Sequence, residues 1–161
     1  MRTHHREIAP AGTAPRRRRR SGIAETVASS AARNSAVARH PLDGPAFRAH
    51  ADALFGDAPD GITMQQGGRI VYANRRMAEL TGHGDPAGLV GLSSLHFYAE
   101  DDLTQVLARL QSTFFGKPTT PARHKLRRLD GTKIPVEAAC MLLTLASSPV
   151  LVEVVRGLSS R

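Results

Sequence analysis

Several features that define common classes of protein are scarce or missing from this sequence of 161 residues. There is one cysteine, Cys140, so no intrachain disulfide can form, which is typical of a reducing compartment such as the cytoplasm. Tryptophan is absent and aromatic residues make up only 4%, so the core must be mainly aliphatic. No stretch approaches the ~20 apolar residues of a membrane helix, so we expect no membrane partner. A secretory signal is not expected either, because charged and polar residues interrupt the segment after Arg16–Arg20.

Positive charge is abundant but unevenly distributed. The formal net charge is +8, and residues 1–43 account for +6 of it, including the run Arg16–Arg20. This stretch shows no helical or strand period, so we expect a disordered basic tail at 1–43 and one domain at 44–161. The arginine run is only a weak indication of nucleic-acid binding, since a solvated tail explains it equally well.

The domain is expected to begin with an amphipathic helix from Pro45 to about Gly56. Pro45 suits a first helical turn, and Phe47, Leu54 and Phe55 fall on one apolar stripe. That stripe must dock either on its own domain or on the same helix of a second subunit.

A hairpin is predicted next, with strands at 62–66 and 69–73 around Gly67-Gly68. Asn74 is placed to cap the helix that follows, and Gly82 to end it. Within this region we expect Met64, Met77 and Leu80 to face the interior.

A longer helix is predicted from Asp101, which would cap it, to about 115. Its apolar residues recur at the spacing of one buried face and include Leu103, Val106, Leu107, Leu110 and Phe114.

Three strands are predicted after this helix. Strand 122–129 places His124 inward, Asp130-Gly131 forms a turn, and a long strand covers 133–145. A strand is predicted at 150–155, and its apolar run indicates a central position.

The predicted fold class is therefore α+β, with a five-stranded antiparallel sheet and helices on one face. The later half of the long strand also has an apolar outer side, which includes Met141 and Leu143. The helix at 45–56 is expected to cover that patch, within the chain or across a dimer.

At this point the sequence resembles the PAS sensory domain over residues 47–156. The resemblance is carried by short motifs in the correct order and spacing: Ala58-Pro-Asp-Gly-Ile62, Gly68-Arg-Ile-Val-Tyr-Ala-Asn74, Glu79-Leu-Thr-Gly82, Ala99-Glu-Asp101, Arg127-Arg-Leu-Asp-Gly131 and Ile134-Pro-Val-Glu137.

The resemblance implies a stand-alone sensory module that binds a small molecule, dimerises, or regulates a signalling partner such as a kinase or transcription regulator. The expected pocket residues are Met64, Tyr72, Met77, Leu80, Leu107, His124 and Cys140.

The motifs that family members use for cofactors are not matched. The lone cysteine lies in a late strand rather than in the motif of light-sensing flavin members, and the long helix has no histidine to hold a haem. The cofactor is therefore unknown. Two alternatives stay open: a haem sensor using His96 or His124, and a nucleic-acid-associated regulator using the arginine-rich tail.

No catalytic pattern is evident. The histidines are scattered, and the carboxylates Glu100, Asp101 and Asp102 are explained by a helix start. We expect no enzymatic activity and a cytoplasmic location.

Overall fold

The computed structural model describes residues 42, 44–117, 119–145 and 147–159. The predicted tail, including Arg16–Arg20, lies outside the described residues. The helices and strands are α3 (Pro45–Phe55), β1 (Gly61–Gln66), β2 (Arg69–Ala73), α4 (Arg75–Thr81), α5 (Leu103–Phe114), β3 (Ala122–Arg127), β4 (Lys133–Leu145) and β5 (Ser148–Gly157), with short 3-10 turns η1 (Pro86–Leu89), η2 (Ser94–Phe97) and η3 (Glu100–Asp102) between α4 and α5.

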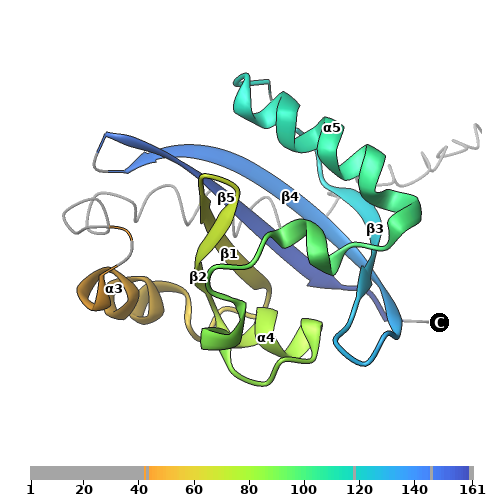
Figure 1. The fold of residues 1–161 in the computed structure, drawn as a ribbon, viewed down its shortest axis with the longest axis horizontal. Coiled ribbons are helices and arrows are strands. Elements are labelled where there is room, and N and C mark those ends of the chain that lie inside the picture. Colours follow the sequence, from red (N-terminus) through yellow and green to blue (C-terminus); the bar gives the residue numbers. More distant parts are fainter. Residues whose placement is uncertain (1–41, 43, 118, 146, 160–161) are drawn as a thin grey trace, which may run out of the picture.

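The five strands form one antiparallel sheet in the order β2-β1-β5-β4-β3. β5 is the central strand, as its mainly apolar sequence predicts. The long β4–β5 hairpin forms the middle of the sheet, with the β1–β2 hairpin on one side and β3 on the other (Figure 1). The predicted α+β fold with a five-stranded antiparallel sheet is confirmed.

Local sequence explains the first hairpin and its helix. Gly67 and Gly68 both have positive φ, 57° and 76°, which only glycine adopts without strain. Asn74 does more than cap α4 through the backbone N–H of Met77. Its Oδ1 also accepts from Ile62 N, and its Nδ2 donates to the carbonyls of Phe55 and Asp60, all at 2.9–3.0 Å. Asn74 therefore ties α3, β1 and α4 together.

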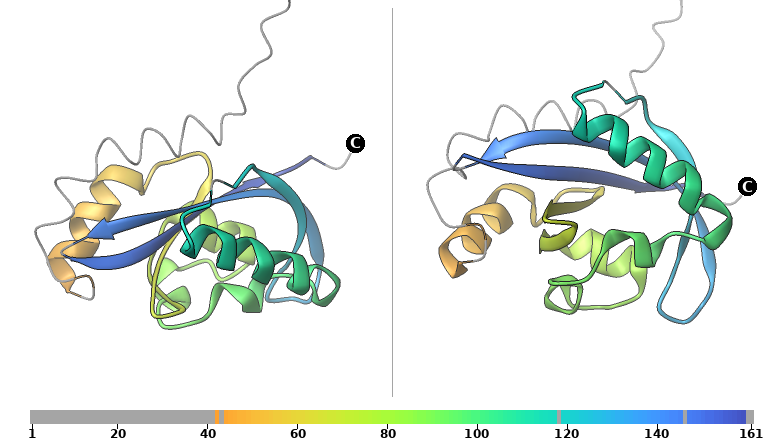
Figure 2. Two further views of the ribbon diagram at one scale, coloured as in Figure 1. Left: turned by 90° about the horizontal axis from the view of Figure 1, so that it is seen from above. Right: turned by 45° about the horizontal axis from the view of Figure 1, so that its top comes forward.

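One face of the sheet, which we call the outer face, is covered by α3. Phe47, Ala51 and Phe55 of α3 are buried, and Leu54 packs beside them. In the views of Figure 2, α3 lies near the end of the long hairpin where β4 turns into β5. The strand residues of this cluster include Ile62, Met64, Tyr72, Ala139, Met141, Leu143, Leu145, Val150, Val152 and Val154.

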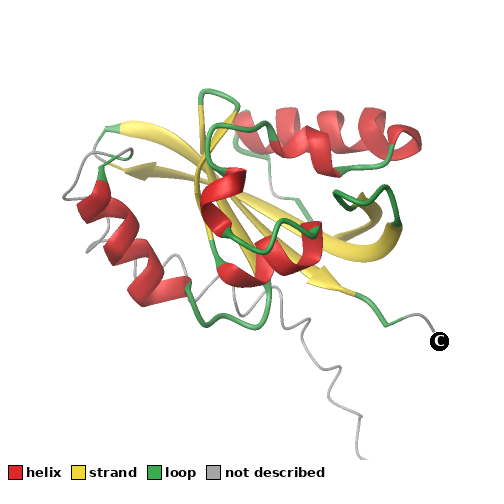
Figure 3. Cartoon of the chain, turned by 60° about the horizontal axis from the view of Figure 1, so that its bottom comes forward, coloured by secondary structure: helices red, strands yellow, loops and turns green. Residues whose placement is uncertain are grey.

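The opposite, inner face carries α4, the 3-10 turns and α5 (Figure 3). Met77 and Leu80 of α4 pack there with Leu126, Val136 and Val155 of the strands. Gly82 ends α4 with φ 79°, as predicted. The Asp130-Gly131 turn also forms as predicted, with Asp130 accepting from the backbone N–H and hydroxyl of Thr132.

One prediction about the long helix is wrong, and a second holds only in part. Asp101 lies in η3 and does not cap α5, which begins after Asp102; the Asp102 carboxylate instead accepts from the backbone N–H of Lys125 at 2.5 Å. The predicted apolar face of α5 is buried only in part: Val106 is buried, as predicted, whereas Leu107 is 42% and Phe114 is 55% exposed. The helix stands beside the sheet and leaves a groove along that face.

Candidate functional site

A groove of about 690 Å³ lies along the apolar face of α5. The helix supplies one wall, and the Gly67-Gly68 turn, η2 and the beginning of β5 supply the others. None of the described residues that line it carries a charged side chain; they are Gln65, Gln66, Gly67, Gly68, Ser93, Ser94, Leu95, Leu107, Leu110, Gln111, Phe114, Phe115, Ser148, Pro149 and Leu151. A groove of this size and composition suits an uncharged, mainly apolar small molecule.

A buried polar network adjoins the groove. Ser94 Oγ donates to Gln65 Oε1 at 3.0 Å, and Gln65 Nε2 donates to Glu153 Oε2 at 3.2 Å. The Tyr98 hydroxyl donates to Glu153 Oε1, and Thr63 lies 3.5 Å from Glu153 Oε2. Gln65 and Ser94 line the groove and belong to the network, so a ligand that bonds to either would reach Glu153 through one or two hydrogen bonds.

Burial governs the protonation of this network. It raises the pKa of Glu153, while the hydrogen bonds from Tyr98, Thr63 and Gln65 act in the opposite direction. Burial, and then the neighbouring Glu153, raise the pKa of Tyr98 well above its ordinary value. Tyr98 therefore remains a neutral hydrogen-bond donor to the carboxyl group.

His124 and Cys140 lie near this network on β3 and β4. The His124 ring meets the Tyr98 ring edge-on at a centroid distance of 5.6 Å, and its buried Nδ1 has no hydrogen-bond partner among the described residues. Burial and the nearby Arg109 lower the pKa of His124. Burial and then Glu153 raise the pKa of Cys140 to about 11, so the thiol stays protonated and unreactive at neutral pH.

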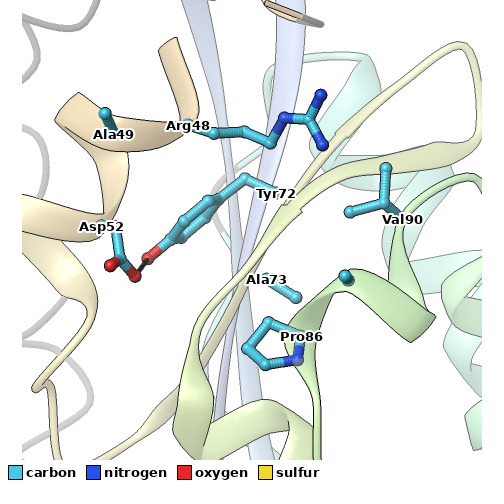
Figure 4. A pocket seen from close by; sticks show the side chains of 8 residues that line it. Arg48, Ala49, Asp52, Tyr72, Ala73, Pro86 and Val90 are labelled. Carbon is cyan, nitrogen blue, oxygen red and sulfur yellow. Dashed lines mark hydrogen bonds between the residues drawn. The ribbon is translucent and has the colours of Figure 1, made fainter. Parts of the chain in front are cut away.

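A second concavity lies on the other side of β2, against α3. This α3 cleft has a volume of about 270 Å³ and is lined by Arg48, Ala49, Asp52, Tyr72, Ala73, Pro86, Ala87 and Val90 (Figure 4). The Tyr72 hydroxyl points toward Asp52, 3.5 Å from its Oδ1. Burial and then Asp52 raise the pKa of Tyr72 above its ordinary value. The cleft is smaller than the α5 groove and has charged residues on its α3 side.

The structure does not bring the predicted pocket residues together. Met64 and Tyr72 belong to the outer cluster with α3, so placing them in an inner pocket was wrong. Met77 and Leu80 are inside, in the apolar cluster under α4. Leu107 lines the groove, and His124 and Cys140 lie beside the buried network rather than in the groove itself.

The network residues Thr63, Gln65, Ser94, Tyr98 and Glu153 were missed from the sequence. Thr63 pairs with Glu153 across β1 and β5, and both side chains lie on the inner face. The neighbouring Ile62 and Met64 therefore lie on the outer face. Met64 was expected to face inward because it is apolar, yet the side chains on both faces of β1 are buried. The one available signal was Glu153 itself, a single carboxylate inside an otherwise apolar strand.

A haem does not fit the groove. Neither His96 nor His124 lines it, so it offers no histidine as an axial ligand. Among the described residues there is also no group of three or more histidine, cysteine or acidic side chains that would hold a metal ion. Within the same part of the chain, no helix is long and apolar enough to cross a membrane.

Comparison with known proteins agrees with this architecture. Residues 51–113 match the family model described as PAS domain. No curated protein matches the chain in sequence.

Solved PAS domains share the fold at low sequence identity. A domain from Colwellia psychrerythraea is 16% identical, with a TM-score of 0.60, covering 70% of this chain and 95% of its own. The PAS domain of an HTR-like protein from Haloarcula marismortui is 22% identical, with a TM-score of 0.55, covering 68% and 90%. The PAS domain of a LuxR-family transcriptional regulator from Burkholderia thailandensis, in complex with ethanol, is 18% identical, with a TM-score of 0.57, covering 68% and 97%.

The match of residues 51–113 to the PAS family model, together with the fold shared with solved PAS domains, supports a PAS domain in this part of the chain.

Proposed function

We propose that this PAS domain senses an uncharged, mainly apolar small molecule that binds in the α5 groove. The observation that carries the proposal is the composition of the groove: about 690 Å³, apolar along α5, and without a charged lining side chain. Leu107 and Phe114 are exposed to it, and a ligand would cover both. The similar Burkholderia domain was solved with ethanol, a small uncharged molecule.

The response to the ligand would travel by two routes. A ligand that packs on Leu107 and Phe114 would fix the position of α5 relative to the sheet. A ligand that bonds to Gln65 or Ser94 would compete with their existing bonds and disturb the donors of Glu153 on the central strand β5. Either change would alter a surface that a partner, such as a kinase, a transcription regulator or a second copy, reads in the cytoplasm. No catalytic step is required.

Binding of the uncharged dye Nile red tests the groove. We expect Leu107→Gln to weaken dye binding about tenfold, because an unpaired buried amide costs roughly 1–3 kcal/mol. The matched control is Leu129→Gln, since Leu129 is 69% exposed on the β3–β4 turn and does not line the groove. Equal binding by wild type and Leu107→Gln would contradict the proposal, as would the absence of any dye binding.

A further inference from the structure

A separate cleft of about 400 Å³ lies at the other end of the inner face, where the loop after α4 and η2 meet the β3–β4 turn. It shares no lining residue with the α5 groove, and its character is basic rather than neutral. Its lining residues are His83, Leu92, His96, Phe97, Arg127, Arg128, Leu129 and Gly131.

Two arginines are held in place there by backbone carbonyls. Arg127 Nη2 donates to the carbonyl of His96 at 3.2 Å, and Arg128 Nη2 donates to the carbonyl of Glu79, in the last turn of α4, at 3.3 Å. A guanidinium has five N–H donors, so each arginine keeps most of its donors for another partner. Arg128 Nε is buried and has no hydrogen-bond partner among the described residues. A buried donor in this state favours an acceptor that enters from the cleft.

The orientation of His83 is also fixed. The Thr81 hydroxyl lies 2.9 Å and 3.2 Å from the carbonyls of Met77 and Ala78, so its one proton is directed into α4. At 3.1 Å from His83 Nδ1, the same oxygen must therefore accept, which places a proton on Nδ1 and leaves Nε2 as the other polar atom of the ring. The ring packs edge-on against Phe97 at a centroid distance of 5.4 Å.

Two carboxylates, Glu79 and Asp130, lie near the cleft. No lining residue is a carboxylate. Glu79 forms an ion pair with Arg76 at 3.0 Å, and Asp130 accepts two hydrogen bonds from Thr132. Asp130 interacts electrostatically with Arg128 and offsets part of its charge, whereas Arg127 forms no ion pair with a described carboxylate.

We propose that this basic cleft binds a small organic anion, a phosphate monoester or a carboxylate, with an apolar body. The anion would accept from Arg127 and Arg128, and the body would lie against Leu92, Phe97 and Leu129. The two guanidinium groups provide charge-assisted bonds, which are the stronger class of hydrogen bond. Because the cleft and the groove share no residue, this site stands or falls independently of the proposed function.

Calorimetric titration of the full chain with phenyl phosphate tests the site. We expect Arg127→Gln to weaken binding about tenfold, which corresponds to about 1.4 kcal/mol. Arg123→Gln is the matched control, because Arg123 lies on the same strand, is exposed, loses the same charge and does not line the cleft. Arg127→Lys, which keeps the charge but not the planar fork, should lie between them. These variants should keep the wild-type melting temperature within a few degrees, since each changes an exposed side chain.

Further ligands identify the chemistry. Benzoate in place of phenyl phosphate distinguishes a carboxylate site from a phosphate site, and phenol should not bind. Three outcomes would overturn the proposal. The first is no binding of phenyl phosphate at about 10 mM, where millimolar ligands are nearly saturating. The second is equal binding of phenol. The third is an equal loss in Arg123→Gln, which would indicate the diffuse basic surface that suits a nucleic acid.

Discussion

The two faces of the sheet are built from the same strands but differ in kind. On the outer face, Ile62 and Met64 of β1 pack with Val152 and Val154 of β5 in an apolar cluster that also includes residues of α3. On the inner face, the alternate positions of these strands are Thr63, Gln65 and Glu153, which hydrogen-bond to one another. Successive side chains of a strand point to opposite faces. Neighbouring residues of β1 and β5 therefore belong to an apolar core on one face and to a polar network on the other.

The difference indicates that the outer face mainly stabilises the fold and that the inner face is suited to respond to a ligand. The outer face buries Phe47, Ala51 and Phe55 of α3 in its apolar cluster, and this burial stabilises the fold. The inner face near α5 has a polar interior and a helix whose apolar residues are half exposed. A partner lost from this network leaves a buried polar group unsatisfied, which costs about 1–3 kcal/mol, so a ligand that competes for Gln65 or Ser94 would act strongly on the inner face.

The largest expected effect is a loss of stability on the outer face. We expect Phe47→Ala to lower the free energy of unfolding by about 3–5 kcal/mol, because a fully buried phenylalanine leaves a cavity. The matched change on the inner side is Phe114→Ala in α5, where the side chain is 55% exposed and the loss should stay below about 1 kcal/mol. Urea unfolding measures both. Equal losses would mean that α5 is packed as tightly as α3 and that the two faces do not differ in this respect.

The two tyrosines make the next test, since one hydroxyl lies on each side of the sheet. Tyr98→Phe removes a donor from a buried carboxylate, so we expect a loss of about 1.5–3 kcal/mol. Tyr72→Phe removes only a 3.5 Å contact to the exposed Asp52, and the loss should be under about 0.5 kcal/mol. If Tyr72→Phe lowers the free energy of unfolding more than Tyr98→Phe does, the polar network of the inner face contributes little to stability.

The part of the fold that could be predicted from the sequence is the part set by turn and helix-capping residues. Gly67-Gly68, Asn74 and Gly82 have conformations or hydrogen bonds that few other residues provide, and each performs the predicted role. The apolar run of β5 likewise predicts its central position. These signals depend on a residue and its immediate neighbours, so they survive without knowledge of the tertiary structure.

The site was less predictable because it depends on which side of each element is covered. Helical periodicity places Leu107 and Phe114 on one face of α5, but it does not say whether the sheet or solvent meets that face. In β1, alternation separates Met64 from Gln65 without indicating which of the two faces α5. The apolar run of β5 predicts a buried strand but does not show which residues pair with Glu153. A buried carboxylate needs partners, and here they lie on neighbouring elements.

Protonation gives the most delicate test, because it involves one proton on each of two inner-face groups. Burial raises the pKa of Glu153, so the unfolded chain loses this proton first, at about pH 4.3, and the folded state is progressively destabilised as pH rises above that value. His124 has the opposite sign. Its pKa is lowered in the fold, so its contribution is present above about pH 6.5 and is lost as pH falls below it.

Two neutral variants separate these contributions. Relative to wild type, Glu153→Gln should gain stability as pH rises from about 4.5 to about 7, and His124→Gln should gain stability as pH falls over the same range. The differences from wild type, measured by urea unfolding at several pH values, cancel the other titrating groups, because these remain in each variant. Parallel curves for wild type and Glu153→Gln would show that Glu153 titrates as an ordinary solvated carboxylate. The polar network would then not be sealed from water, and the contrast between the two faces would rest on α3 and α5 alone.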